Sequence, residues 1–204
     1  MTRKRGRLIV LEGIDGSGKS TLADALARRW QSAGRPVARW HEPSDPDLGA
    51  RAALVGRSNP WAAALIFTLD RAVTRPQLER LLDRSDVIAD RSFYSTLAYQ
   101  GSLLPAPARR RLETLQRRVA VAPDVVLLLD LRPDTALERV GRRGKDRSAF
   151  ERLATLRRVS RSYRGFARKE GWAVLDAAQT PSELLADAER RLPLPRRRRP
   201  ARRV

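Results

Sequence analysis

The chain has 204 residues, a length that suits a single α/β domain with a sheet covered by helices on both faces. It contains no cysteine, which excludes disulfides, thiolate nucleophiles and cysteine-based zinc sites. No stretch is apolar over the length of a membrane span, and the apolar run after the basic N-terminus is too short for a signal peptide. We therefore expect a cytoplasmic protein that does not enter a membrane.

The formal net charge is +19, and such a basic balance is often found in proteins that bind nucleic acid. Much of this charge lies in the two termini, because residues 1–7 and 193–204 contain four and six basic residues and no acidic one. We interpret them as a basic N-terminal extension and a basic, disordered tail on either side of one domain at residues 8–192. Contact between these tails and nucleic acid is the alternative.

Short apolar runs alternate with amphipathic helical patterns along the chain. The runs predict strands at 7–11, 36–40, 87–90, 124–130 and 172–176. The helical patterns cover 19–33, 60–82, 92–101, 106–121, 133–140, 147–169 and 181–192. This alternation indicates an α/β fold with a five-stranded parallel sheet flanked by helices. Ligands of such sheets bind beyond the carboxyl ends of the strands.

The residues after the first predicted strand form a phosphate-binding motif. Gly13 to Ser20 fit G-x-x-x-x-G-K-[ST], in which glycines let backbone N–H groups curl around phosphate oxygens at a helix N-terminus. Lys19 is expected to reach the β- and γ-phosphates, and the Ser20 hydroxyl to ligate Mg²⁺. A glycine-rich turn without a ligand is the alternative, but the strand before the motif and the helix after it favour nucleotide triphosphate binding.

A second polar pair follows the strand predicted at 87–90. The Asp90 carboxylate can hold Mg²⁺ through water or accept a proton, and the Arg91 guanidinium can bind a second phosphate with two parallel hydrogen bonds. Asp90 is alternatively a helix cap, because Asp-Arg-Ser is also a reasonable helix start. The phosphate-binding motif favours the functional interpretation.

Four cations stand close together between two predicted helices. They are Arg142, Arg143, Lys145 and Arg147, in a segment that also contains two glycines. Such a segment can close over a triphosphate as a lid and neutralise the transferring phosphoryl group as water leaves. An exposed basic loop is the alternative, and composition alone does not decide between the two.

The helix predicted at 60–82 carries two residues suited to base recognition. Phe67 and Arg71 are four residues apart and share one helix face, so the ring can stack on a base while the guanidinium donates to its edge. The spacing also fits a core position for Phe67 and an ion pair of Arg71 with Asp70 or Glu79. His41 has no companion ligands, and we interpret it as a polar residue at a strand end rather than a metal ligand.

Taken in order, these segments resemble the thymidylate kinase family from about Leu8 to Leu192. The Ala-Tyr-Gln-Gly run at 98–101, at its distance after Asp90, is the most specific piece, whereas the phosphate-binding motif alone would indicate only a P-loop kinase. The matching pieces are Leu11-Glu12 with the motif through Thr21, Glu42-Pro43, Phe67-x-x-Asp70-Arg71, Asp90-Arg91, Ser95-Thr96-x-Ala98-Tyr99-Gln100-Gly101, Pro123-Asp124, Leu129-Asp130-Leu131-x-Pro133 and Asp146-Arg147. The resemblance implies a P-loop NTPase fold with a short arginine-rich lid, transfer of the γ-phosphoryl group of ATP to dTMP with Mg²⁺ as cofactor, and a homodimer.

The resemblance also implies which positions of this sequence are functional. It assigns ATP binding to Gly13, Ile14, Asp15, Gly16, Ser17, Gly18, Lys19, Ser20 and Thr21. It assigns acceptor binding to Glu42, Phe67, Arg71, Arg91, Thr96 and Tyr99, and metal binding to Ser20, Asp15 and Asp90. Catalysis would fall to Lys19, Asp15, Asp90, Arg91, Arg143 and Arg147.

Among these positions, Phe67 would stack on thymine, Arg71 would donate to the base edge, and Tyr99 would pack against the sugar and disfavour a ribose 2′-hydroxyl. Gly16 stands where part of the family has a loop arginine. The transition-state cation would therefore come from the lid, from Arg143 or Arg147.

The sequence departs from the family pattern at His41, before Glu-Pro, and at Ser92, after Asp-Arg. Asp-Arg-Ser is similar to the Glu-Arg-Ser of deoxynucleoside kinases, a related P-loop group that phosphorylates the 5′-hydroxyl. A deoxynucleoside or another deoxynucleotide is therefore the alternative acceptor. A further alternative is a non-catalytic nucleotide-binding protein with basic tails that bind nucleic acid.

Overall fold

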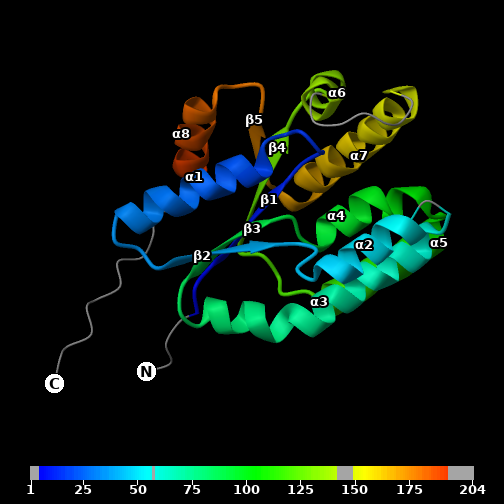
Figure 1. Ribbon diagram of the computed structural model, residues 1–204, viewed down its shortest axis with the longest axis horizontal. Helices are drawn as coiled ribbons and strands as arrows, with labels where there is room; N and C mark the ends of the chain where they lie inside the picture. The colour runs from blue at the N-terminus through cyan, green and yellow to red at the C-terminus, as the bar shows by residue number, and fades with distance from the viewer. Residues whose placement is uncertain (1–4, 57, 142–148, 193–204) are drawn as a thin grey trace.

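The computed structural model describes residues 5–56, 58–141 and 149–192. Within these ranges, the strands form one five-stranded parallel sheet in the order β2-β3-β1-β4-β5 (Figure 1). The strands are β1 (Leu8–Glu12), β2 (Val37–His41), β3 (Asp86–Asp90), β4 (Val125–Asp130) and β5 (Ala173–Asp176). The predicted α/β class and parallel sheet are confirmed, and the strand ends differ from the predicted ones by a residue.

Helices cover both faces of the sheet (Figure 1). They are α1 (Lys19–Ser32), α2 (Pro46–Val55), α3 (Pro60–Leu82), α4 (Phe93–Tyr99), the 3₁₀ turn η1 (Gly101–Leu103), α5 (Ala106–Val119), α6 (Pro133–Gly141), α7 (Ala149–Glu170) and α8 (Pro181–Arg191). Residues of α1, α7 and α8 pack with one face of the sheet, and residues of α3, α4 and α5 pack with the other. Among the described residues, no helix combines the length and the apolar character that a bilayer crossing requires.

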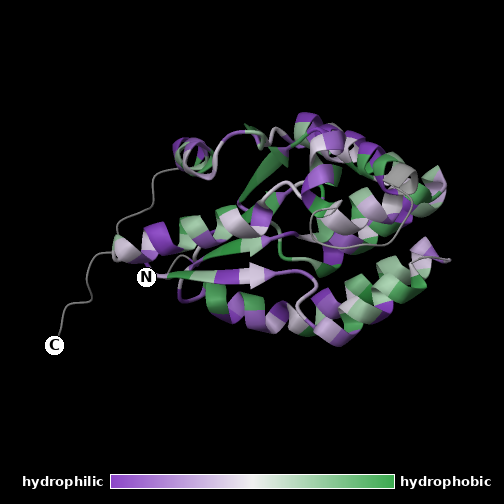
Figure 2. Ribbon diagram, turned by 45° about the horizontal axis from the view of Figure 1, so that its top comes forward, coloured by the Kyte–Doolittle hydropathy of each residue, from purple (hydrophilic) through white to green (hydrophobic). Residues whose placement is uncertain are grey.

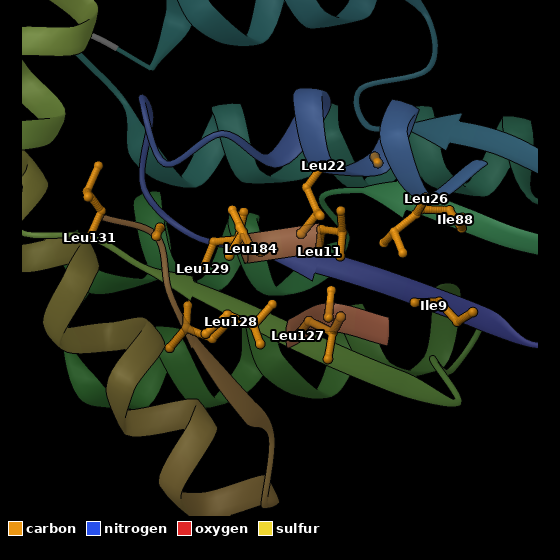
Figure 3. Packing of buried hydrophobic residues seen from close by; sticks show 14 of the residues in the cluster. Ile9, Leu11, Leu22, Leu26, Ile88, Leu127, Leu128, Leu129, Leu131 and Leu184 are labelled. Atoms are coloured by element: carbon orange, nitrogen blue, oxygen red, sulfur yellow. The ribbon is translucent and has the colours of Figure 1, made fainter. Parts of the chain in front are cut away.

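The side chains of β1 supply both halves of the core. Ile9 and Leu11 belong to the same buried cluster as Leu22 and Leu26 of α1, and Figure 3 shows Leu11 beside Leu22, while alternate residues of the strand pack with α3 and α4. Every residue of β1 is buried, which explains why its sequence shows no polar alternation. Figure 2 shows the same division, with hydrophobic residues on the central strands and mixed hydropathy along the helices around them.

Helix α2 is absent from the sequence-based prediction, which left residues 46–55 without an element. Asp45 caps this helix by accepting hydrogen bonds from the backbone N–H groups of Asp47 and Leu48, and Pro46 occupies its first turn. This Asp-Pro start is a recognisable helix signal. The helix was missed because only Ala52 is buried, so its apolar periodicity is weak.

The predicted helix at 92–101 is also shorter in the structure. Ser92 caps α4 with its side chain, the helix ends at Tyr99, and the separate 3₁₀ turn η1 begins at Gly101. The division of the chain into residues 1–7, 8–192 and 193–204 stays a prediction, because residues 1–4 and 193–204 lie outside the described ranges.

Candidate active site

The carboxyl ends of β1 and β3 bring the phosphate-binding motif beside Asp90 and Arg91. These strands are paired neighbours, and the backbone N–H of Arg91 donates to the Leu11 carbonyl at 3.0 Å. The loop between β1 and α1 turns tightly, with positive φ angles of 151° at Gly13 and 85° at Gly16. A Cβ atom would lie 2.6 Å from the Leu129 carbonyl oxygen at the first position and 2.7 Å from that of Ala136 at the second, so only glycine fits.

Lys19 is buried inside this loop. Its Nζ donates to the carbonyl oxygens of Gly13 at 3.0 Å and Ile14 at 2.9 Å. Burial, and next the positive charge of Arg91, lower the pKa of Lys19 to about 8, against the opposing effect of nearby carboxylates. The amine is therefore held by two neutral carbonyl acceptors, which an anion can replace.

Ser20 and Asp90 place a hydroxyl and a carboxylate side by side at the edge of the loop. The Ser20 hydroxyl donates to Asp90 Oδ2 at 2.5 Å. Asp90 Oδ1 is buried and has no hydrogen-bond partner among the described residues. No group of three or more potential side-chain ligands occurs in the described ranges. One hydroxyl and one carboxylate with a free oxygen fit Mg²⁺, which takes few protein ligands and is completed by water and substrate phosphates.

Arg91 lies between the loop and α4, with a backbone φ of 75° that is unusual for a residue with a side chain. Its guanidinium forms an ion pair with the Asp15 carboxylate, donates to Ser95 Oγ at 3.2 Å and lies 5.4 Å from the centre of the Tyr99 ring. Such a backbone costs on the order of 1 kcal/mol or more and persists where the surroundings hold it. The strained position aims the guanidinium at the mouth of the phosphate loop.

Asp15 and Tyr99 complete this corner of the site. The backbone N–H of Asp15 donates to the Tyr99 hydroxyl at 3.1 Å. Burial acts to raise the pKa of Asp15, but Arg91 and Lys19 outweigh it and the pKa is lowered, so the carboxylate is ionised. The structure thus pairs Asp15 with Arg91, whereas Ser20 pairs with Asp90.

Glu12 is a buried carboxylate that sequence reasoning did not single out as functional. It accepts hydrogen bonds from Ser92 N at 2.8 Å, Ser92 Oγ at 2.7 Å and Ser95 Oγ at 2.8 Å. Burial raises the pKa of Glu12, which these serines and Arg91 oppose. A glutamate directly after an apolar strand was the available signal. Ser92, one of the departures from the family pattern, is engaged in this contact.

Arg71, on α3, is held by polar side chains from three other segments of the chain. Its Nε and Nη2 donate to Glu42 Oε2 at 3.0 and 2.5 Å, and Nη2 also donates to Thr96 Oγ1 at 3.3 Å. Its Nη1 donates to the side-chain oxygen of Gln116. The alternative ion pair with Asp70 or Glu79 is wrong: Arg71 pairs with Glu42.

The two rejected carboxylates have other partners. Asp70 accepts the backbone N–H groups of Ser44 at 3.0 Å and Asp45 at 2.7 Å, and so holds the loop that follows β2. Glu79 pairs with Arg75 one turn away. That loop begins with the cis peptide bond between Glu42 and Pro43. Glu42, at the start of the loop, contacts α3 through its ion pair with Arg71.

Phe67 lies one turn before Arg71 on α3 and is half-buried. It belongs to neither of the two core clusters formed by the described residues, so the core alternative is not supported. His41 is exposed at the end of β2, as expected for a polar residue at a strand end.

The predicted lid cations fall outside the described residues, Arg143 and Arg147 included. The described neighbour of the loop is α6, whose Arg139 donates to the Gly16 carbonyl at 3.5 Å and the Ala177 carbonyl at 3.1 Å. Sequence reasoning missed Arg139, because only the folded chain brings α6 against the phosphate loop.

A parallel α/β sheet with a lysine-bearing phosphate loop, an adjacent hydroxyl–carboxylate pair and a second arginine defines a P-loop phosphotransferase. The family model described as thymidylate kinase matches residues 11–188. The chain belongs to the thymidylate kinase family, as the sequence resemblance predicted, and is an ATP-dependent nucleoside monophosphate kinase.

Curated relatives agree with this assignment over most of the chain. A thymidylate kinase of Leifsonia xyli is 38% identical, covering 94% of this chain and 96% of its own. A probable thymidylate kinase of Methanosarcina barkeri is 37% identical over 87% and 91%, respectively. Probable thymidylate kinase 1 of Saccharolobus solfataricus is 32% identical over 89% and 94%.

Proposed function

We propose that this site transfers the γ-phosphoryl group of ATP to the phosphate of dTMP, giving dTDP and ADP. The observation that carries the proposal is the ion pair between Arg91, on the acceptor side, and Asp15, which lies in the same phosphate loop as Lys19. An acceptor phosphate is already a nucleophile at neutral pH, so the site needs alignment and charge neutralisation more than proton removal.

The donor side is the loop from β1 to α1. In this proposal Lys19 exchanges its two carbonyl acceptors for the β- and γ-phosphates, and the loop N–H groups bind the remaining phosphate oxygens. The ATP-binding residues are Gly13, Ile14, Asp15, Gly16, Ser17, Gly18, Lys19, Ser20 and Thr21. Arg143 or Arg147 supplies the transition-state cation.

Ser20 and Asp90 would hold Mg²⁺, with Asp15 nearby on the acceptor side. The unpartnered Asp90 Oδ1 and the Ser20 hydroxyl are the observations that support this choice. When bound, the ion would neutralise charge on the transferring phosphoryl group and help align it.

The acceptor side begins at Arg91, which would exchange the half-exposed Asp15 carboxylate for the dTMP phosphate. Tyr99 would pack against the sugar and Phe67 against the base. Arg71, next to Glu42 and Thr96, presents only donors, so it favours the carbonyl oxygen of thymine over the amino group of cytosine.

The acceptor is tested by measuring ADP release with dTMP, dUMP, dCMP, dGMP and thymidine in parallel. The proposal predicts a higher kcat/KM with dTMP than with dCMP or thymidine, because thymidine lacks the phosphate for Arg91 and cytosine lacks the carbonyl oxygen that Arg71 would bind. A preference for thymidine over dTMP would contradict it and favour a deoxynucleoside kinase. DNA binding that is lost on deletion of residues 193–204, without any kinase activity, would favour the non-catalytic alternative.

The second part of the proposal is a homodimer formed through α3. Leu65, Leu69 and Val73 are spaced four residues apart on this helix and are 41%, 51% and 61% exposed. Leu54 of the neighbouring α2 is 67% exposed. Three apolar side chains on one helix face are more than a monomer surface needs, and a second copy would cover them.

The dimer is tested by light scattering after size-exclusion chromatography. Leu69→Glu places a charge in the middle of the apolar stripe and should convert a dimer to a monomer, whereas Leu103→Glu, an exposed leucine outside the stripe, should leave the dimer intact. A monomeric wild-type protein would contradict this part of the proposal.

We place the reaction in the cytoplasm, which the absence of cysteine supports.

A further inference from the structure

Gln116 is a glutamine of α5 whose side chain has no solvent exposure and touches the arginine assigned to the base. Its Oε1 accepts a hydrogen bond from Arg71 Nη1, and its Nε2 donates to Thr68 Oγ1 at 2.6 Å. We infer that Gln116 is a positioning residue that, together with Thr68, fixes the guanidinium of Arg71 for the acceptor base. This inference rests on the proposed function, in which Arg71 donates to that base.

The orientation of the Gln116 amide is determined by its two neighbours. Thr68 Oγ1 donates its one hydrogen to the Ala64 carbonyl at 2.7 Å, so toward Gln116 it can only accept. Arg71 can only donate. A side chain between them must therefore present a donor to one and an acceptor to the other. An amide does both, a carboxylate offers no donor to Thr68, and an apolar side chain offers neither.

Gln116 acts on a part of Arg71 that Glu42 does not reach. Glu42 Oε2 accepts from both Nε and Nη2, which are on one edge of the guanidinium, and Thr96 also binds Nη2. A plane held along one edge can still tilt about that edge. The bond from Nη1 to Gln116 fixes the far nitrogen, and with it the plane.

The same arrangement leaves a donor for the ligand. A guanidinium has five N–H groups, and the described residues accept four: one on Nε, two on Nη2 and one on Nη1. The fifth, on Nη1, has no partner among the described residues. Because Gln116 holds Nη1 itself, the direction of this remaining N–H is set directly by the Gln116 amide.

A purely structural role for Gln116, tying α5 to α3, makes a different prediction from a positioning role. Loss of a structural tie lowers stability and affects both substrates or neither. Loss of a positioning contact raises the KM for the acceptor and leaves the KM for ATP unchanged. This effect should disappear when Arg71 is removed.

The test is a double-mutant cycle of Gln116→Met and Arg71→Ala, with KM measured for both substrates. Methionine keeps the length of the side chain and removes both hydrogen bonds. We expect Gln116→Met to raise the KM for dTMP about tenfold, the size of one hydrogen bond to a charged group, and to change the KM for ATP less than about twofold. In the Arg71→Ala background the same change should have an effect below about twofold. Equal effects in both backgrounds, or a parallel rise in the KM for ATP, would overturn the inference.

A matched control is Leu112→Ala, one turn earlier on α5. Leu112 is also fully buried, but its apolar side chain makes no hydrogen bond to Arg71, so its truncation loosens the helix and leaves every hydrogen bond of Arg71 in place. Its KM for dTMP should stay within about twofold of wild type. An increase as large as that of Gln116→Met would show that loosening α5 suffices, and would contradict a positioning role.

Should Gln116→Met fail to fold, Thr68→Val gives a second test. Valine has nearly the shape of threonine but cannot accept from Nε2, so the amide loses its fixed orientation. The KM for dTMP should rise about threefold with an unchanged KM for ATP, and an unchanged KM for dTMP in a folded protein would overturn the inference.

Failure of the inference and failure of the proposed function are distinguishable. If the wild-type protein does not phosphorylate dTMP, the proposed function fails, and the cycle is run with the nucleotide that the protein does phosphorylate. Coupling between Gln116 and Arg71 with that nucleotide supports the positioning role, and its absence overturns that role alone.

Discussion

At the proposed phosphate end of the site, charged side chains are held by partners that a substrate can replace, whereas at the proposed base end they are fixed by buried neighbours. Lys19 donates to two backbone carbonyls, and Arg91 pairs with a carboxylate whose side chain is 50% exposed. Arg71, by contrast, is 6% exposed and held by Glu42, which is 11% exposed. The phosphate end is therefore built to exchange partners on binding, and the base end is preorganised before binding.

The difference has a physical reason. A phosphate brings enough charge to displace a neutral carbonyl or a solvated carboxylate. The partners that hold Lys19 and Arg91 without substrate therefore do not prevent phosphate binding. A base is uncharged, and its hydrogen bond to a guanidinium contributes only about 1.5–3 kcal/mol, a gain that would be lost if the base had to reorganise a loosely held arginine. Three substitutions and one measurement of proton uptake test this difference between the two ends.

Lys19→Ala removes the cation at the centre of the loop. Loss of a charge that stabilises the transferring phosphoryl group should lower kcat by about a hundredfold to a thousandfold. The measurement is steady-state ADP release at saturating ATP and dTMP. Circular dichroism serves as the folding control, and a folded variant with near-normal kcat would contradict the assignment of the loop.

Arg91→Ala removes the contact with the acceptor phosphate and frees Asp15. We expect kcat/KM for dTMP to fall about a hundredfold, while the KM for ATP changes little, because Arg91 lies on the acceptor side. Ser95→Ala is a milder matched variant, since it removes one neutral partner of Arg91. A larger fall in kcat/KM for ATP than for dTMP would contradict the placement of Arg91 on the acceptor side.

Arg71→Ala tests the preorganised end. The KM for dTMP should rise about tenfold to a hundredfold, and the preference for dTMP over dCMP should shrink, because the donor-only contact with the base is lost. The kcat value should change less than with Lys19→Ala. An unchanged ratio of dTMP to dCMP kcat/KM would show that Arg71 does not recognise the base.

The pKa of Lys19 gives the smallest and most specific effect. Without substrate its pKa is lowered to about 8, first by burial. A bound triphosphate favours the protonated amine, so ATP binding should take up protons above pH 8, up to about one per site, and ATP affinity should fall as the pH rises through that range. Calorimetry in buffers of different ionisation enthalpy measures this uptake. Equal proton uptake at about pH 7 and about pH 8.5 would contradict the partner exchange.

The grouping of residues at the proposed phosphate end could be predicted from sequence because these residues are adjacent in the chain or follow strands. Gly13 to Ser20 form one contiguous motif, and the parallel register of β1 and β3 is enough to bring Asp90 and Arg91 beside it. The pairing of Ser20 with Asp90 follows from the same topology.

The base end could be predicted only in part. Helical spacing placed Phe67 and Arg71 on one face, but the partner of Arg71 comes from Glu42, which α3 meets only through tertiary packing. Gln116 and Glu12 could not be identified from sequence for the same reason. The role of a polar residue in an apolar pattern depends on its partners, which only the fold determines. Helix α2 could not be predicted because a short helix with one buried residue shows little apolar periodicity.

The most direct test of the account is the binding of a two-headed ligand in which adenosine and thymidine are joined through their 5′-positions by a chain of five phosphates. If the two phosphate sites meet between Lys19 and Arg91, one molecule fills both sites and its dissociation constant should be at least about a hundredfold below that of ATP or dTMP alone. A ligand of this kind that binds no tighter than ATP would contradict the account, because the two substrates would then not lie head to head.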